Sequence, residues 1–509
     1  MAEINELNKL FYINVGASGS FKPSGDSTID STPQDVDNII EHLKTQRQKK
    51  IVLYFHGGLK NAKKGMSTAE IISKEVLQQT NSHPICFVWE TGLIDTISQN
   101  FDTIKKSNFF KRLLLRIIKV AGQKLGIDIK DFQGFAKGVD QLSDHEIELE
   151  LEKSKPFDNY VVNTGKKAAN VVTAEMLDDD DAIDTLLSAE IEAQIEEEVY
   201  SDYELQAAAN EPKSEAEAKL MDSEKIAPNQ NHVGAKGVIE LTQLIIAAVK
   251  ITLRVVKRHI KGRDHGFFPT IVEEILRQYY IADLGTWLWG RMKNKARLMW
   301  SENNFEGNEE DWKVGSYFLH KLVEYQNEVG ELTIDVVGHS AGSIVINEMA
   351  NSITSRNLNL KFRHVIFLAP ALRCDEFQRT LLNKPYLFKD FRCFTMADKF
   401  ETQDSMIPYL YTRSLLYFIS GVLENDSKIK DDRSDAHILG LERHVTGNTP
   451  YDRIDYLKDI KTFLEPKGKI VYAVTEDGVE DGFRCTAKGH TFFDDEQPTL
   501  HSVMFIINQ

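Results

Sequence analysis

Short apolar segments recur toward both ends of the chain, and each has the pattern of a strand that is buried on both faces. These segments are five or six residues long, are rich in β-branched and aromatic residues, and lack the alternation of a half-exposed strand. Continuous apolar runs of this kind are typical of parallel sheets that helices cover on both sides. The predicted strands lie at residues 10–15, 51–55, 85–89, 333–337, 364–368, 391–396 and 469–474.

Helical patterns separate several of these strands, for example at residues 312–328 and 343–353. Because strand and helix alternate, we expect an α/β fold with a mostly parallel sheet. The alternation stops in the middle of the chain, where a basic apolar stretch, an acidic segment and a long helical pattern follow one another. The predicted organisation is a first part of the α/β domain at 1–92, a mainly helical insertion at 93–308 and a second part at 309–509.

The net charge of −16 comes largely from one acidic segment. Residues 168–212 contain fourteen acidic side chains and neither Lys nor Arg, so the rest of the 509-residue chain is nearly neutral. An acidic segment repels phosphate backbones, and the sequence contains no nucleic-acid-binding motif, so we expect no nucleic-acid partner.

Cations gather at residues 105–123 and 237–261, and two interpretations of them are open. They face lipid at a membrane surface, or they pair with the acidic segment inside the insertion. We favour pairing, because the acidic segment is close in sequence and would repel anionic lipid. Peripheral membrane contact, and a protein partner bound through the acidic insertion, stay open as alternatives.

The four cysteines are scattered along the chain and form no CxxC pair. This spacing disfavours a zinc site or a disulfide framework and indicates small buried residues in a reducing compartment. The sequence has no signal-peptide pattern and no apolar run of about 18 residues, so we expect a cytoplasmic protein without a membrane span. The cysteines are Cys86, Cys374, Cys393 and Cys485.

The strongest candidate for chemistry is Ser340, directly after the strand predicted at 333–337. Residues 338–342 read G-H-S-A-G, and an apolar helical pattern follows them. A serine hydroxyl becomes a nucleophile when a base takes its proton, and a sharp strand-to-helix turn exposes the oxygen. Because G-x-S-x-G alone also arises by chance, the order of strand, motif and helix is what makes Ser340 the predicted nucleophile.

A second element points to the same chemistry. The strand predicted at 51–55 is followed directly by His56, Gly57 and Gly58. Acyl transfer needs backbone N–H donors for an oxyanion, and glycine lets the chain approach closely. We expect one donor from Gly57, Gly58 or Leu59 and the other from Ala341. His56 precedes the serine, so we interpret it as a buried brace of this loop.

The H-G-G strand, the G-H-S-A-G turn and the order of the strands resemble the α/β-hydrolase superfamily, on its esterase and lipase side. The resemblance covers roughly residues 50–90 and 311–506 and leaves the insertion unexplained. It implies a triad in the chain order nucleophile, acid, histidine, with the acid after the strand at 391–396 and the histidine after the strand at 469–474.

Both implied positions hold a suitable residue. Asp398 follows the strand at 391–396 and is the implied acid, which would fix the tautomer of the imidazole. His490 lies in a loop after the last strand and is the implied base, since imidazole accepts and returns a proton near neutral pH. The alternatives are Asp404 and Asp375 for the acid, and His501 and His444 for the base.

The resemblance implies hydrolysis of a carboxylic ester or lipid acyl bond through an acyl-enzyme, without a metal or organic cofactor. The same residues would serve a thioesterase, an amidase or an acyltransferase, because fold and triad do not define the substrate. Two other functions stay open. One is a hydrolase-fold scaffold that acts through the acidic insertion, and the other is a membrane-associated phospholipase.

Overall fold

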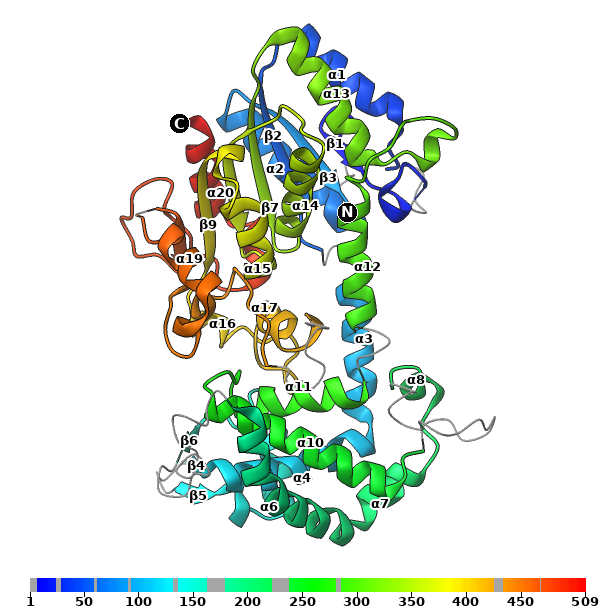
Figure 1. Cartoon of the computed structure of the whole chain (residues 1–509), viewed down its shortest axis with the longest axis vertical. Helices are drawn as coiled ribbons and strands as arrows, with labels where there is room; N and C mark the ends of the chain where they lie inside the picture. The colour runs from blue at the N-terminus through cyan, green and yellow to red at the C-terminus, as the bar shows by residue number, and fades with distance from the viewer. Residues whose placement is uncertain are drawn as a thin grey trace, which may run out of the picture. The chain divides into compact units, whose positions relative to one another are not determined.

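The computed structural model describes residues 7–23, 29–58, 62–89, 93–130, 136–162, 179–221, 238–280, 285–424, 434–466 and 468–509. The chain divides into two compact units, which are described separately; Figure 1 shows the elements of each. The first unit comprises Met1–Asp95, Trp289–Glu401 and His437–Gln509, and the second comprises Thr96–Leu288 and Thr402–Ala436.

A parallel sheet of seven strands forms the centre of the first unit's described residues, in the order β1-β3-β2-β7-β8-β9-β10. Every neighbouring pair in this sheet is parallel. Each segment predicted as a strand forms one of them, which confirms the α/β class. The strands are β1 (Tyr12–Asn14), β2 (Lys50–Phe55), β3 (His83–Val88), β7 (Thr333–His339), β8 (Phe362–Leu368), β9 (Phe388–Met396) and β10 (Ile470–Ala473).

Helices cover both faces of this sheet (Figure 1). Val52 and Tyr54 of β2 belong to a core shared with α2 and α20. Phe55 instead stacks on Phe87, with ring centroids 4.8 Å apart, and Phe87 also contacts Phe318 of α13. Successive side chains of a strand point to opposite faces, so a strand with two covered faces is apolar throughout. The helices here include α1 (Pro33–Thr45), α2 (Ala62–Gln79), α12 (Gly285–Leu298), α13 (Val314–Val329), α14 (Gly342–Ser355), α15 (Cys374–Phe377), α16 (Asp398–Glu401), α18 (Glu442–Val445), α19 (Asp455–Leu464) and α20 (Gln497–Asn508).

The order of the strands reverses between β2 and β7, which lie side by side. From β2 the chain continues to β3 on one side, and from β7 it continues to β8 on the other. In open parallel sheets such a reversal leaves a crevice outside the carboxyl ends of the two strands, where ligands bind. Phe55 pairs with Gly338, so residues 56–58 and 340–342 leave the sheet at the same edge.

All four cysteines are buried with free thiols, as the sequence indicated. Burial raises the pKa of Cys86 to about 12, and it raises the pKa of the other three as well. A thiol that keeps its proton is a poor nucleophile, so these side chains contribute to packing rather than to chemistry.

The second unit is mainly helical, as predicted for the insertion, and it also contains a small antiparallel sheet in the order β5-β4-β6. In α6, Ile183, Leu187 and Ile191 recur every fourth residue and are buried, and this helix packs against α10 and α4. The elements include α3 (Leu93–Lys106), α4 (Asn108–Leu125), β4 (Ile127–Lys130), β5 (Ala136–Gly138), α5 (Asp144–Leu151), β6 (Tyr160–Val162), α6 (Asp180–Ser201), α7 (Tyr203–Asn210), α8 (Glu215–Ala218), α10 (Leu241–Ile260), α11 (Phe267–Tyr279) and α17 (Leu415–Phe418).

Cations of α4 and α10 pair with the acidic segment. Arg116 contacts Glu198 at 2.6 Å and Asp202 at 2.8 Å, and Lys257 contacts Asp184 at 3.0 Å. The pairing interpretation is therefore confirmed for these cations, while residues 168–178 of the acidic segment lie outside the described residues. Among the helices that the structure describes, none has the length and apolar character needed to cross a membrane.

The boundaries of the second unit differ from the predicted 93–308 in two places. Residues 289–308 belong to the first unit, because Trp300 packs on Phe87 of the sheet with ring centroids 5.6 Å apart. Residues 402–436 join the second unit, because Tyr411 donates a hydrogen bond to buried Glu273 at 2.6 Å. These contacts join residues that are far apart in the sequence, so no local sequence pattern predicts the two boundaries.

Candidate active site

Ser340 lies in a sharp turn between β7 and α14, with a backbone φ of +50°. This φ is unfavourable for a residue with a side chain, and it persists where surrounding contacts fix it. The Ser340 N–H donates to the carbonyl of Leu368 at 2.8 Å. Its carbonyl accepts from the Ser343 hydroxyl at 2.6 Å and from the Ala371 N–H at 3.1 Å. The predicted nucleophile therefore occupies a strained and firmly held turn.

Close packing explains the two glycines of the motif. A Cβ atom on Gly342 would overlap the carbonyl oxygen of Phe55. A Cβ atom on Gly338 would lie 2.7 Å from Cδ1 of Ile346 and 2.9 Å from the backbone of Gly342. Side chains at either position would push the turn away from β2 and α14, so glycine is required at both.

His490 reaches the serine: its Nε2 lies 2.9 Å from Oγ of Ser340, and both residues are buried. The other histidines weighed from the sequence lie elsewhere. Nδ1 of His444 accepts a hydrogen bond from the Ile438 N–H at 2.9 Å, and His501 is an exposed residue of α20. The structure thus brings together the predicted nucleophile and the histidine that chain order favoured.

The surroundings of His490 keep its imidazole neutral. Burial lowers the pKa of His490 to about 3, the charge of His339 acts in the same direction, and the charge of Asp494 opposes both. A neutral imidazole whose Nε2 faces a hydroxyl can accept the proton of that hydroxyl, as a general base does.

Labelling of Ser340 by a fluorophosphonate is expected to persist in mild acid. An imidazole with the usual pKa of about 6.5 would lose about 30-fold in rate at pH 5, whereas the lowered pKa of His490 predicts a rate within about twofold of that at pH 8. The rates are measured by intact mass. A half-loss near pH 6.5 would contradict the expectation.

A control for folding is needed in that experiment. The unfolded chain binds the His490 proton below about pH 6.5 and the folded chain does not, so stability is full above this pH and falls as the solution becomes more acidic. Circular dichroism at each pH therefore separates loss of the fold from loss of the base.

The three candidates for the triad acid lie in different environments. Asp398 begins α16, directly after β9, and its N–H donates to Oε2 of Glu442 at 2.6 Å. Asp375 pairs with Arg373 at 2.8 Å. Asp404 belongs to the second unit. Asp398 and Asp375 belong to the same unit as Ser340 and His490, and the role of Asp398 as the triad acid stays a prediction.

The glycine loop after β2 packs against the serine turn. A Cβ atom on Gly57 would lie 3.2 Å from Cβ of Ser340, and one on Gly58 would lie 2.9 Å from Cβ of Ala341. Among the residues that the structure describes, the N–H groups of Gly58 and Ala341 donate to no protein acceptor. Both are therefore available to an oxyanion at this point. Leu59, the third candidate donor of this loop, lies outside the described residues.

His56 braces this loop, as the sequence interpretation proposed. Its Nε2 accepts from the Trp89 N–H at 3.1 Å, so its Nδ1 carries the proton and donates to the carbonyl of Gly57 at 2.7 Å. The C=O and N–H of a trans peptide point in opposite directions, so this contact turns the Gly58 N–H away from His56. The brace thereby fixes the orientation of one expected oxyanion donor.

Sequence reasoning missed two residues of this site, His339 and Asp494. Nδ1 of His339 lies 3.0 Å from Oδ2 of Asp494, and its Nε2 lies 3.0 Å from the backbone carbonyl of His490. The hydroxyl of Tyr54 donates to the same Oδ2 at 3.0 Å. The available signal was weak: His339 occupies a variable position of the motif, and Asp494 is a carboxylate four residues after the predicted base.

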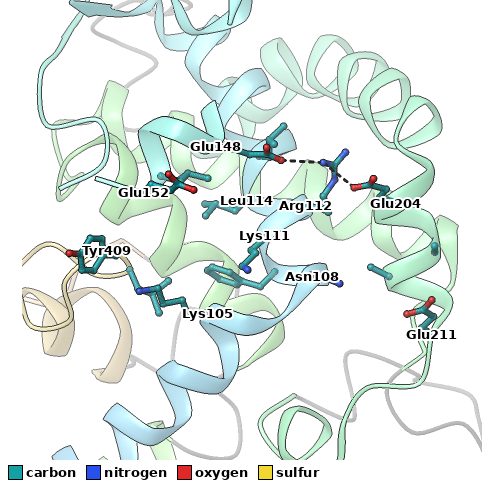
Figure 2. A pocket seen from close by; sticks show the side chains of 16 residues that line it. Lys105, Asn108, Lys111, Arg112, Leu114, Glu148, Glu152, Glu204, Glu211 and Tyr409 are labelled. Atoms are coloured by element: carbon teal, nitrogen blue, oxygen red, sulfur yellow. Dashed lines mark ion pairs between the residues drawn. The ribbon is translucent and has the colours of Figure 1, made fainter. Parts of the chain in front are cut away.

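A cavity of about 830 Å³ lies in the second unit, among α4, α5, α7 and residues 409–410 (Figure 2). Figure 2 shows Arg112 between Glu148 and Glu204, with ion-pair distances of 3.6 and 3.3 Å. Lys105 lies over the ring of Tyr409, 4.5 Å from its centroid. No residue of the site predicted from the sequence lines this cavity, so it takes no part in the predicted chemistry.

Comparisons with known proteins identify no relative of this chain: no family model, no curated protein and no solved structure matches it. The α/β class rests on the observed sheet. Any functional assignment rests on the residues around Ser340.

Proposed function

We propose that this protein is a serine hydrolase of the α/β-hydrolase superfamily that cleaves a carboxylic ester or lipid acyl bond. The observation that carries the proposal is the 2.9 Å contact between Oγ of Ser340 and Nε2 of His490 in the turn after β7. The position of this turn also supports the proposal. The glycine loop follows β2 and the serine turn follows β7, and the strand order reverses between these two strands, where ligands bind in open parallel sheets.

The proposed reaction begins when neutral His490 takes the proton of Ser340 as Oγ attacks the acyl carbonyl carbon. The carbonyl oxygen becomes an oxyanion, which the N–H groups of Gly58 and Ala341 stabilise together with the N-terminus of α14. When the tetrahedral intermediate collapses, the bond to the leaving group breaks and His490 returns its proton to that group. The product of this half-reaction is an acyl-enzyme on Ser340.

In the second half-reaction, His490 takes a proton from water as the water oxygen attacks the acyl carbonyl. Collapse of this intermediate releases the carboxylic acid and returns the proton to Oγ of Ser340. Asp398 is the proposed acid that orients His490. Each step uses side chains, backbone N–H groups and water.

Covalent labelling with a fluorophosphonate tests the proposal. We expect one adduct on the wild-type protein by intact mass and none on Ser340→Ala. Ser352→Ala is the matched control, because Ser352 is also buried in α14 but donates its hydroxyl to the carbonyl of Trp300, and it should be labelled as fast as wild type. An adduct that persists on Ser340→Ala, or folded wild-type protein without an adduct, would overturn the proposal.

The two alternative functions have less support. A phospholipase that docks through basic helices needs cations directed at lipid, but Arg116 and Lys257 contact acidic residues of the second unit. The proposal of a scaffold that acts through the acidic segment is also weaker, because acidic residues of this segment pair with cations of their own unit. The absence of labelling described above would favour the scaffold.

A further inference from the structure

His339 faces hydrogen-bond acceptors at both of its ring nitrogens. Its Nε2 lies 3.0 Å from the backbone carbonyl of His490, and a carbonyl can only accept. Its Nδ1 lies 3.0 Å from Oδ2 of Asp494. That oxygen also accepts from Tyr54, whose phenol keeps its proton because burial and the charge of Asp494 raise the pKa of Tyr54 well above its usual value.

These contacts determine where the protons are. Nε2 of His339 must carry hydrogen to bond the His490 carbonyl. Because Oδ2 of Asp494 already accepts from Tyr54, we infer that its bond to Nδ1 is made by a proton on the imidazole. His339 is therefore an imidazolium paired with a carboxylate. Because both side chains are almost fully buried, each charge needs this partner.

His339 connects the three parts of the candidate site. Its backbone precedes Ser340 in the turn, and its Nε2 holds the loop that carries His490. Its ring also lies against the glycine loop, because a Cβ atom on Gly57 would be 3.3 Å from Nδ1 of His339. A shift of this ring would move the base relative to the nucleophile and to the oxyanion donors.

We propose that His339 is a positioning residue for the base: Asp494 holds it as an imidazolium, and its Nε2–H fixes the His490 loop so that the imidazole of His490 reaches Ser340. The inference rests on the proposed function. Catalysis by a positioned base depends steeply on geometry, and a misplacement of about 1 Å costs on the order of 100-fold in rate. The ionisable groups in contact with His339 are Asp494 and His490 after β10, while Tyr54 on β2 bonds the same carboxylate and is itself acted on by Cys86 on β3 and by Asp495.

Two substitutions of His339 separate its two contacts. In His339→Gln the side-chain amide nitrogen can take the place of Nε2 and still donate to the His490 carbonyl. In His339→Asn the shorter amide can replace Nδ1 and donate to Asp494, but it does not reach His490. Both variants remove the same charge and part of the same ring, so a merely structural role predicts similar rates once both are shown to be folded.

We expect fluorophosphonate labelling of His339→Gln to stay within about 10-fold of wild type, and that of His339→Asn to be slower by about 100-fold or more. Circular dichroism and urea unfolding show whether the two variants are equally folded. Equal labelling rates of two folded variants would overturn the positioning role while the proposed function stands. Rescue by glutamine, but not by asparagine, is the result that supports it.

Nuclear magnetic resonance of protein labelled with ¹⁵N-histidine tests the charge without using activity. We expect one histidine with both ring nitrogens protonated, and we expect its signals to disappear in His339→Gln. A wild-type spectrum with no such histidine overturns the ion pair. If wild-type protein is not labelled by the fluorophosphonate, the proposed function fails, and this spectrum still decides the state of His339.

Discussion

Replacing His490 by glutamine is expected to slow fluorophosphonate labelling of Ser340 by about 10³-fold. General base catalysis by a positioned side chain contributes about 10² to 10⁴ in rate, and glutamine fills similar space but cannot take up a proton at neutral pH. Nε2 of His490 is 2.9 Å from Oγ of Ser340, so the substitution removes the proton acceptor at that oxygen. The rate constant follows from intact mass spectra taken over time.

His501→Gln is the control for this experiment. His501 is exposed on α20 and pairs with Asp481 at 3.7 Å, so its replacement should leave the rate within about twofold of wild type. If His490→Gln were labelled within about tenfold of wild type, another group would have to activate the serine, and the assignment of His490 as the base would be wrong.

In the second unit, Glu273→Gln is expected to cost about 3–5 kcal/mol of stability, because it removes one of the two buried carboxylate charges that contact the buried Arg258. Glu273 is fully buried and contacts Arg258 and His265, each at 2.7 Å. Tyr411 also donates to it, so the substitution weakens the attachment of residues 402–436 to α11. Hydrogen exchange of the α10 and α11 amides measures the change for this unit alone.

Tyr411→Phe is the matched control, since it removes one hydrogen bond to the same carboxylate and should cost about 1 kcal/mol. Although burial acts in the opposite direction, the charges of His265 and Arg258 hold the pKa of Glu273 well below its usual range. The stability from this carboxylate is therefore present above about pH 4.3 and is lost as the pH falls below it. A cost below about 1 kcal/mol for Glu273→Gln would show that the cluster tolerates the loss of this charge.

The sequence was sufficient to predict the sheet, because a strand buried on both faces must be apolar at every position. Val52 and Phe55 belong to opposite faces, and both are buried. The serine turn was predictable for a related reason, since crowding at Gly338 and Gly342 limits which residues fit there. Local sterics and burial leave their signature within a few neighbouring residues.

Contacts between distant residues left no such signature. His339 and Asp494 are 155 positions apart, and nothing near either residue indicates that they meet. Tyr411 and Glu273 are 138 positions apart, so residues 402–436 looked like part of the domain around them. In both cases the partner is selected by the tertiary fold rather than by periodicity, which is why the missed residues are buried polar ones.

The interleaving of the two units has a consequence for synthesis on the ribosome. Residues 96–288 emerge before residues 402–436, which supply Tyr411 to the buried cluster, so the second unit cannot close until the ribosome has passed position 436. The first unit waits longer, because β10 and His490 follow that segment. Domains usually fold one after another as they emerge. Here the segments of the two units alternate along the chain, so each unit stays incomplete while segments of the other are synthesised. The serine turn is thus translated 150 residues before its proposed base, and the two meet only after His490 has been added to the chain.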